Sequence, residues 1–92
     1  MSAASYSART AEILRLTGLP NVARFPKATV QRRAGHFELL FHGGEHATRV
    51  EVAFRHLGQI DDLELAELDL LAQLQRLGYD VARREPEDEP GA

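Results

Sequence analysis

Two histidines and a glutamate occur within five positions, in the segment His42-Gly43-Gly44-Glu45-His46. Imidazole and carboxylate groups are ligands of zinc and nickel, so the segment invites a metal-binding interpretation. Two adjacent glycines oppose a helix and favour a tight hairpin, however, and a hairpin places His42 and His46 on opposite faces. We therefore interpret the segment as a polar hairpin tip, and the sequence predicts no metal ligand and no cofactor-binding residue.

Residues suited to nucleophilic or acid–base catalysis are scarce. The only serines, Ser2, Ser5 and Ser7, lie near the N-terminus, and the chain has no cysteine. No glycine precedes a helix in the manner of a phosphate-binding loop. The adjacent carboxylates of Asp61 and Asp62 fit the start of a helix, where negative charge is favourable. We expect a protein without catalytic residues, enzymatic activity or a cofactor.

Composition limits the class of protein. The 92 residues are enough for one domain. No apolar run exceeds three residues, which argues against a transmembrane helix or a secretory signal and makes a cytoplasmic location the expectation. Lys27 is the only lysine among 11 basic residues, a bias typical of proteins from GC-rich bacterial or phage genomes.

Charge is distributed unevenly along the chain. Residues 1–58 carry eight Arg or Lys and four Glu, a balance of +4, whereas residues 59–92 carry three Arg and ten Asp or Glu, a balance of −7. Such asymmetry bears on partners and solubility rather than on the fold. Two interpretations stay open: the folded chain brings the halves together and neutralises them, or the asymmetry bears on the choice of partner.

The apolar pattern predicts a helix followed by three strands. Residues 7–17 form a short helix that ends at Gly18, and residues 28–33, 36–42 and 46–55 form strands. We expect residues 1–6 to be flexible, residues 7–84 to form a single α+β domain, and residues 85–92 to be a disordered acidic tail. Residues 79–84 are a short fourth strand or an extended segment.

Strand register can be predicted from charge. Gly43 and Gly44 favour a two-residue turn between the second and third strands, which places Glu38 opposite Arg49. A four-residue loop would place Glu38 opposite Glu51 instead. Since opposite charges across a strand pair are favourable and like charges unfavourable by about 0.2–1 kcal/mol, we expect the two-residue turn.

Helix signals occur at both ends of residues 60–79. Asp61 is the expected N-cap, with Glu64 at the third helical position as in a capping box. Gly78 is the expected left-handed residue after the helix, and Tyr79 is expected to pack back on Leu74 as in a Schellman motif.

The apolar residues of this helix do not fit on one face. At about 100° per residue, six of them share the face expected to meet the core: Leu63, Ala66, Leu70, Leu71, Leu74 and Leu77. Leu65, Leu68 and Ala72 lie nearly opposite. A hydrophobic staple between Ile60 and Leu65 accounts for the first of these. Leu68 and Ala72 are left in acidic surroundings, either as incidental exposed residues or as a contact for a partner.

Glu67 falls within the core-facing arc, and a buried carboxylate requires a partner. Arg32, on the inward phase of the first strand, and His56 are candidates. The expected position is the edge of the arc, from which Glu67 reaches solvent.

The expected fold is α+β in the order α-β-β-β-α, with a three-stranded antiparallel meander and two helices packed on one face. The expected function is that of a small non-enzymatic protein-binding module, an inhibitor or adaptor that docks on a larger protein. One version is a phage-type inhibitor of a nucleic-acid-binding bacterial defence complex, in which the acidic helix competes for a basic groove. The predicted partner-binding residues are Asp61, Asp62, Glu64, Leu68, Ala72, Arg33, Arg49 and Arg55.

A second copy of this chain and nucleic acid are the other candidate partners. A homodimer through the second helix is compatible with the same residues, and no membrane partner is expected. The alternative function is nucleic-acid binding by Arg33, Arg49 and Arg55 on an open sheet face. The element order is also that of double-stranded-RNA-binding domains, but those domains have a lysine-rich start to the second helix. The acidic start in this chain, at residues 61–64, would repel phosphate, so nucleic acid is the disfavoured partner.

Overall fold

The computed structural model describes residues 3–57 and 62–85, with two helices and a four-stranded sheet. The α+β class and the order α-β-β-β-α are confirmed, and residues of the 79–84 segment form a fourth strand. The elements are α1 (Ala3–Thr17), β1 (Lys27–Arg33), β2 (His36–Gly43), β3 (His46–Ala53), the 3-10 helix η1 (Phe54–Leu57), α2 (Leu63–Arg76) and β4 (Asp80–Arg83). Helix α1 begins four residues earlier than predicted. Parts of the predicted flexible N-terminus (residues 1–2) and acidic tail (residues 86–92) lie outside the described residues.

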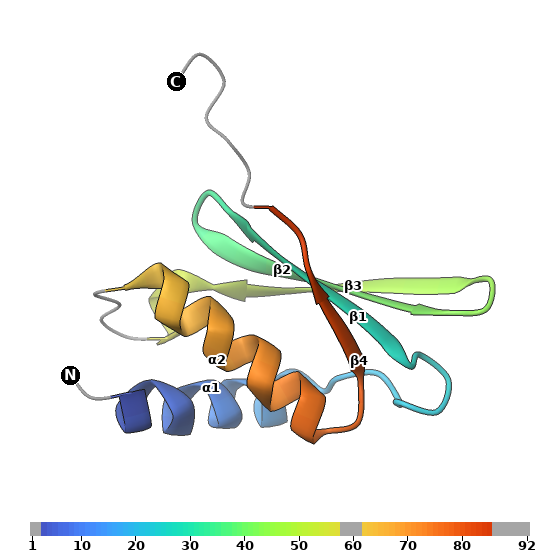
Figure 1. The fold of residues 1–92 in the computed structure, drawn as a ribbon, viewed down its shortest axis with the longest axis horizontal. Coiled ribbons are helices and arrows are strands. Elements are labelled where there is room, and N and C mark those ends of the chain that lie inside the picture. Colours follow the sequence, from blue (N-terminus) through green and yellow to red (C-terminus); the bar gives the residue numbers. More distant parts are fainter. Residues whose placement is uncertain (1–2, 58–61, 86–92) are drawn as a thin grey trace, which may run out of the picture.

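The strands are ordered β3-β2-β1-β4. Strands β1, β2 and β3 form the predicted antiparallel meander, and β4 is parallel to β1. Backbone N–H groups of Asp80 and Arg84 donate to the carbonyls of Pro26 and Val30, at 2.7 and 2.9 Å. A parallel neighbour requires a crossover connection, which α2 provides. Figure 1 shows both helices on one side of the sheet, while the tip of the β2–β3 hairpin extends past them.

The predicted register of the β2–β3 hairpin is wrong by two residues. The turn has two residues, as expected, but they are Gly44 and Glu45, because Gly43 pairs with His46. Glu38 therefore lies opposite Glu51. A positive φ of 58° at Gly44, with no positive φ at Glu45, is the sign pattern of a type II′ turn, which needs glycine only at its first position.

Gly43 is the last residue of β2, and the backbone of the segment before β1 passes very close to it. A Cβ atom at this position would lie 1.7 Å from the carbonyl oxygen of Arg24 and 3.0 Å from the Cα of Phe25. Only a residue without a side chain allows the segment before β1 to cross there. This contact between distant segments fixes the register, and charge pairing along the hairpin does not.

The core lies between the inner face of the sheet and the two helices. Fully or nearly fully buried strand residues are Ala28, Val30, Phe37, Leu39, Phe41 and Val52, while Val50 and Phe54 are partly buried against them. The alternation of apolar residues in the sequence places all of these residues on one face, and a two-residue register shift leaves the faces unchanged. The helices contribute Leu14, Ala66, Leu70 and Leu74. Edge-on ring contacts join Phe37 to Phe54, with centroids 4.9 Å apart.

The two ends of α2 differ in how well the sequence predicted them. At the C-terminal end, Gly78 has φ 104° and donates to the carbonyl of Gln75, and the Tyr79 N–H donates to that of Leu74, so the Schellman motif is confirmed. At the N-terminal end, the cap is Asp62 rather than Asp61, which lies outside the described residues. Leu77, predicted to face the core, is the C-cap and is 53% exposed.

The close approach at Gly43 predicts a position-specific cost of substitution. Gly43→Ala should lower the free energy of unfolding by about 3 kcal/mol, because the new methyl group meets backbone atoms that cannot rotate away. In Gly44→Ala the new methyl group has no atom within 4 Å. The free energy of unfolding should fall by only about 1–2 kcal/mol, because alanine is disfavoured at a positive φ. Urea denaturation of both variants tests this, and an equal or smaller loss at Gly43 would contradict the packing argument.

Candidate protein-binding surface

An apolar strip lies on the solvent side of α2, opposite its buried residues. Leu65 and Leu68 are 47% and 45% exposed, and Ala72 is half-buried. Ile60, the predicted staple partner of Leu65, lies outside the described residues, and a cap at Asp62 places Leu65 at the third helical position instead of the fourth. Leu65 therefore joins the two residues predicted from the sequence. The α2 strip is hereafter Leu65, Leu68 and Ala72.

The acidic start of α2 has a structural role. The Asp62 Oδ1 atom accepts hydrogen bonds from the backbone N–H groups of Glu64 and Leu65, at 3.0 and 3.3 Å. This arrangement satisfies two of the donors left open at a helix N-terminus. Asp62 is exposed, so its carboxylate also faces solvent beside the α2 strip.

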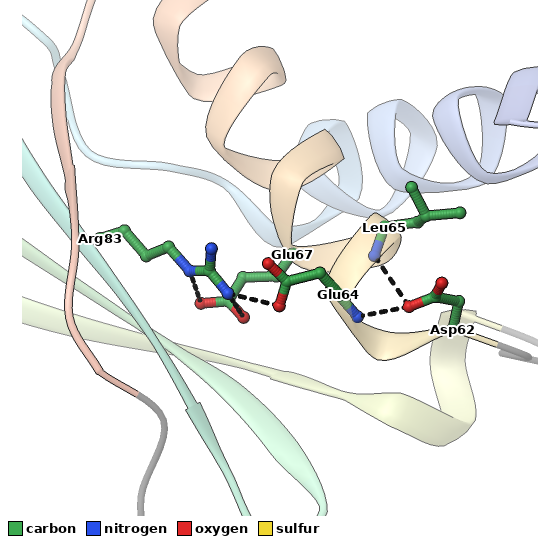
Figure 2. Close-up of polar contacts among 5 residues, drawn as sticks. All are labelled: Asp62, Glu64, Leu65, Glu67 and Arg83. Carbon is green, nitrogen blue, oxygen red and sulfur yellow. Dashed lines mark hydrogen bonds and ion pairs between the residues drawn. The ribbon is translucent and has the colours of Figure 1, made fainter.

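Glu67 is completely buried, contrary to the prediction that it reaches solvent. Its partner is neither Arg32 nor His56 but Arg83 on β4. The Arg83 Nε atom donates to Glu67 Oε2 at 3.0 Å, and Nη2 donates to Oε1 at 3.2 Å. Figure 2 shows the guanidinium of Arg83 reaching from the strand to the helix. This two-pronged contact compensates for the loss of water around the carboxylate.

The same guanidinium contacts a second carboxylate. Arg83 Nη2 donates to Glu64 Oε2 at 2.5 Å. This hydrogen bond, with the positive charges of Arg83 and Arg32, lowers the pKa of Glu64 despite partial desolvation. The hydrogen bonds that Arg83 donates to Glu64, and then those to Glu67, raise the pKa of Arg83. Glu64 remains exposed at the end of the α2 strip, but its carboxylate forms an ion pair with Arg83.

The outer face of the sheet, opposite the helices, is centred on Glu38, which is 8% exposed. Arg33 Nε donates to Glu38 Oε2 at 2.7 Å, and Arg49 Nη1 donates to Oε1 at 3.3 Å. The Arg33 hydrogen bond is the main cause that lowers the pKa of Glu38, against its desolvation. Both arginines lie diagonally to Glu38 in the ladder, which explains how the chain accommodates Glu51 directly opposite.

The predicted residues thus fall into separate groups. Arg33 and Arg49 meet at Glu38, whereas Arg55 is exposed in η1 rather than on the outer face, because β3 ends at Ala53. Leu68 and Ala72 lie on the helix side of the molecule. The residues that sequence reasoning missed are Leu65, whose helical position opposite the core was visible, and Arg83, for which no local signal existed.

A second apolar feature lies where the C-terminal halves of the helices meet the segment after α1. It is a hollow of about 490 Å³ lined by Leu14, Leu19, Val22 and Tyr79. Arg15 and Arg76 also line it. The Tyr79 hydroxyl donates to the Pro20 carbonyl, which holds this segment against the end of α2.

The part of the chain that the structure describes contains neither a cluster of metal ligands nor a membrane-spanning helix. Across residues 3–57 and 62–85, no three His, Asp or Glu side chains gather as metal ligands would. In the same residues, neither helix combines the length and the apolar character needed to cross a bilayer. His42 and His46 are both exposed, and the ring of His46 lies near that of Phe25, with centroids 6.3 Å apart.

The fold and surface define an α+β protein with a mixed four-stranded sheet and an apolar strip on its second helix. No protein-family model, curated protein or solved structure matches this chain. The chemistry of the described residues is therefore the basis for any functional proposal.

Removing Arg83 should destabilise the fold through Glu67. Arg83→Gln leaves a buried carboxylate without its cation, and we expect a loss of about 3 kcal/mol, the low end of the range because Arg83 itself is one-third exposed. Arg84→Gln, at the next and exposed position, should change stability by less than about 0.5 kcal/mol. The double variant Glu67→Met with Arg83→Met should recover most of the loss. Urea denaturation measures all three, and a stable Arg83→Gln protein would contradict the assigned role.

The pKa of Glu38 predicts a pH-dependent contribution to stability. Because the folded-state pKa is lowered from its ordinary value of 4.5, the ionised carboxylate stabilises the fold above that pH, and the contribution disappears as the pH falls below it. Glu38→Gln should be about 1 kcal/mol less stable than wild type at pH 7, and the difference should shrink between pH 5 and pH 3. The control is Glu45→Gln at the hairpin tip. A pH-independent difference would contradict the ion-pair assignment.

Proposed function

We propose that this protein is a small non-enzymatic protein-binding module that docks on a larger protein through α2. The observation that carries the proposal is the pair of leucines on the solvent side of α2, Leu65 and Leu68, each nearly half exposed and one helical turn apart. Leucines at this spacing are the anchors that an amphipathic helix inserts into an apolar groove.

The charges around the α2 strip indicate the chemistry of the partner. Asp62 and Glu64 lie at its N-terminal end and remain exposed, although each has an intramolecular contact. A complementary surface is an apolar groove with cationic residues at one end. This pattern is compatible with an inhibitor or adaptor, and also with a target whose groove normally holds nucleic acid.

The outer face of the sheet gives less support to direct nucleic-acid binding. Two of its arginines, Arg33 and Arg49, contact the carboxylate of Glu38. Phosphate would have to compete with this internal anion, and Glu51 adds a second negative charge in the same row. The protein-binding proposal is therefore the better supported of the two.

A charge inserted in the α2 strip should abolish partner binding without unfolding the protein. Immobilised Leu65→Glu/Leu68→Glu protein should lose a partner that wild type captures from bacterial lysate, because both positions are exposed and glutamate is favourable near a helix N-terminus. The control is Leu16→Glu on α1, where the leucine is 67% exposed. This variant should keep the partner. Titration of the purified partner, followed by calorimetry, measures the affinities.

Two results would contradict the proposal. One is capture of the same partner by wild type and by the α2 double variant with equal affinity. The other is salt-dependent binding of generic single- or double-stranded oligonucleotides at low ionic strength, lost on substitution of outer-face arginines, since phosphate contacts are strongest at low salt. Circular dichroism spectra and thermal melts of every variant establish that the fold is retained.

A further inference from the structure

Strand β3 has a free edge that is long for a sheet of this size. It has eight residues and pairs with β2 on one side, whereas the other edge strand, β4, has four residues. Within residues 3–57 and 62–85, no strand pairs with the other side of β3, and β3 contains no proline. A strand with unpaired N–H and C=O groups is a template for another strand.

The direction of the free backbone groups follows from two contacts. The Phe54 N–H donates to the Gly35 carbonyl at 3.1 Å, one step beyond the pairing of His36 with Ala53. At the other end, the pair of Gly43 and His46 closes a two-residue turn. In an antiparallel pair, alternate residues bond to the neighbouring strand. Even-numbered residues of β3 therefore face β2, and odd-numbered ones direct their N–H and C=O groups outward.

The outward-directed residues form a sequence that is complementary to itself. They are Ala47, Arg49, Glu51 and Ala53. If a second copy pairs antiparallel about a two-fold axis at Val50, Arg49 lies opposite Glu51 of the second copy, and Glu51 opposite its Arg49. Both charge pairs occupy hydrogen-bonded positions, and Ala47 lies opposite Ala53.

Charge selects this register from those that the backbone permits. An axis at Arg49 would place two arginines opposite each other, and an axis at Glu51 would place two glutamates opposite each other. A further shift toward the turn would bring Glu51 opposite Glu45. Only the axis at Val50 pairs both charged residues with opposite charges, and like charges directly opposite are destabilising.

Packing agrees with the same axis. Val50 lies on the inner face of the sheet and is partly buried at the edge of the core. In the pairing described, it meets Val50 of the second copy at a position without cross-strand hydrogen bonds, where side chains approach most closely. The contact covers apolar surface that the helices of one chain leave open. Arg49, whose side chain is 62% exposed, can contact Glu51 of the second copy without leaving Glu38.

From these observations we propose that β3 is an interaction edge for a second copy of this chain. Two copies pair through β3 about a two-fold axis at Val50, and their sheets join into one sheet of eight strands. Main-chain hydrogen bonds supply the contact, and the charges of Arg49 and Glu51 supply its register. The α2 strip takes no part, so this proposal is independent of the proposed function.

Charge reversal at Glu51 tests the proposal without threatening the fold. Within one chain, Glu51→Arg replaces a like-charge pair with Glu38 by an attractive one and removes a 3.8 Å contact of Glu51 with the His36 ring, so the monomer should be about as stable as wild type. Between copies it places arginine opposite arginine at both positions, and we expect the dimer dissociation constant to rise by about tenfold or more. The double variant Arg49→Glu/Glu51→Arg restores both pairs and should restore the dimer.

Sedimentation velocity over a range of concentrations gives the result. Wild type and the double variant should show a species of twice the 10.2 kDa chain mass, and Glu51→Arg should remain a monomer at the same concentrations. A monomeric wild type at millimolar concentration would overturn the proposal. So would a dimer that Glu51→Arg leaves intact, in particular one abolished by Leu65→Glu/Leu68→Glu, because its contact would then be α2.

Discussion

A carboxylate without solvent access lies where α2 meets β4, and the position of these two elements depends on how its charge is compensated. Glu67 is tolerated because the planar guanidinium of Arg83 contacts both of its oxygens. Arg83 lies in the ladder opposite Val30 of β1, so the ion pair fixes the helix relative to the sheet and the strand relative to its neighbour. Strand β4 has only four residues, and the buried ion pair adds to its pairing with β1 a specific contact with α2.

Glu38 shows the same solution on the other face of the sheet, with Arg33 and Arg49 as its cations. In both cases the pairs join residues from the same half of the chain. Arg83, Glu64 and Glu67 belong to the acidic half, and the Glu38 cluster to the basic half. These pairs therefore do not neutralise one half by the other. Between the halves, the positive charge of Arg32 in the basic half lies near Glu64 in the acidic half and contributes to lowering its pKa.

The sequence predicted those features that depend on local chemistry. Alternation identified the inner face of the sheet, and Gly78 identified the end of α2, because each pattern involves neighbouring residues. The sequence did not predict the features that depend on contacts between residues far apart in the chain. The hairpin register depends on the Arg24 carbonyl above Gly43, and the burial of Glu67 depends on a strand sixteen residues away. Of the α2 strip, Leu68 and Ala72 were predicted, while Leu65 was assigned to a staple because the cap was placed one residue early.

The two proposed interaction surfaces lie far apart in the sheet order, which matters for how they could act together. Strand β3 is one edge, whereas α2 packs over β1 and β4 toward the other edge. A dimer through β3 would therefore leave the α2 strip of each copy open, on the same side of the joined sheet. A target with two suitable grooves would then be bound twice, and the second contact would be intramolecular, so avidity could exceed the affinity of either strip. Such an arrangement benefits a binding site as small as the α2 strip. The free energy gained from one small apolar contact only slightly exceeds the entropic cost of association, so a single strip binds weakly.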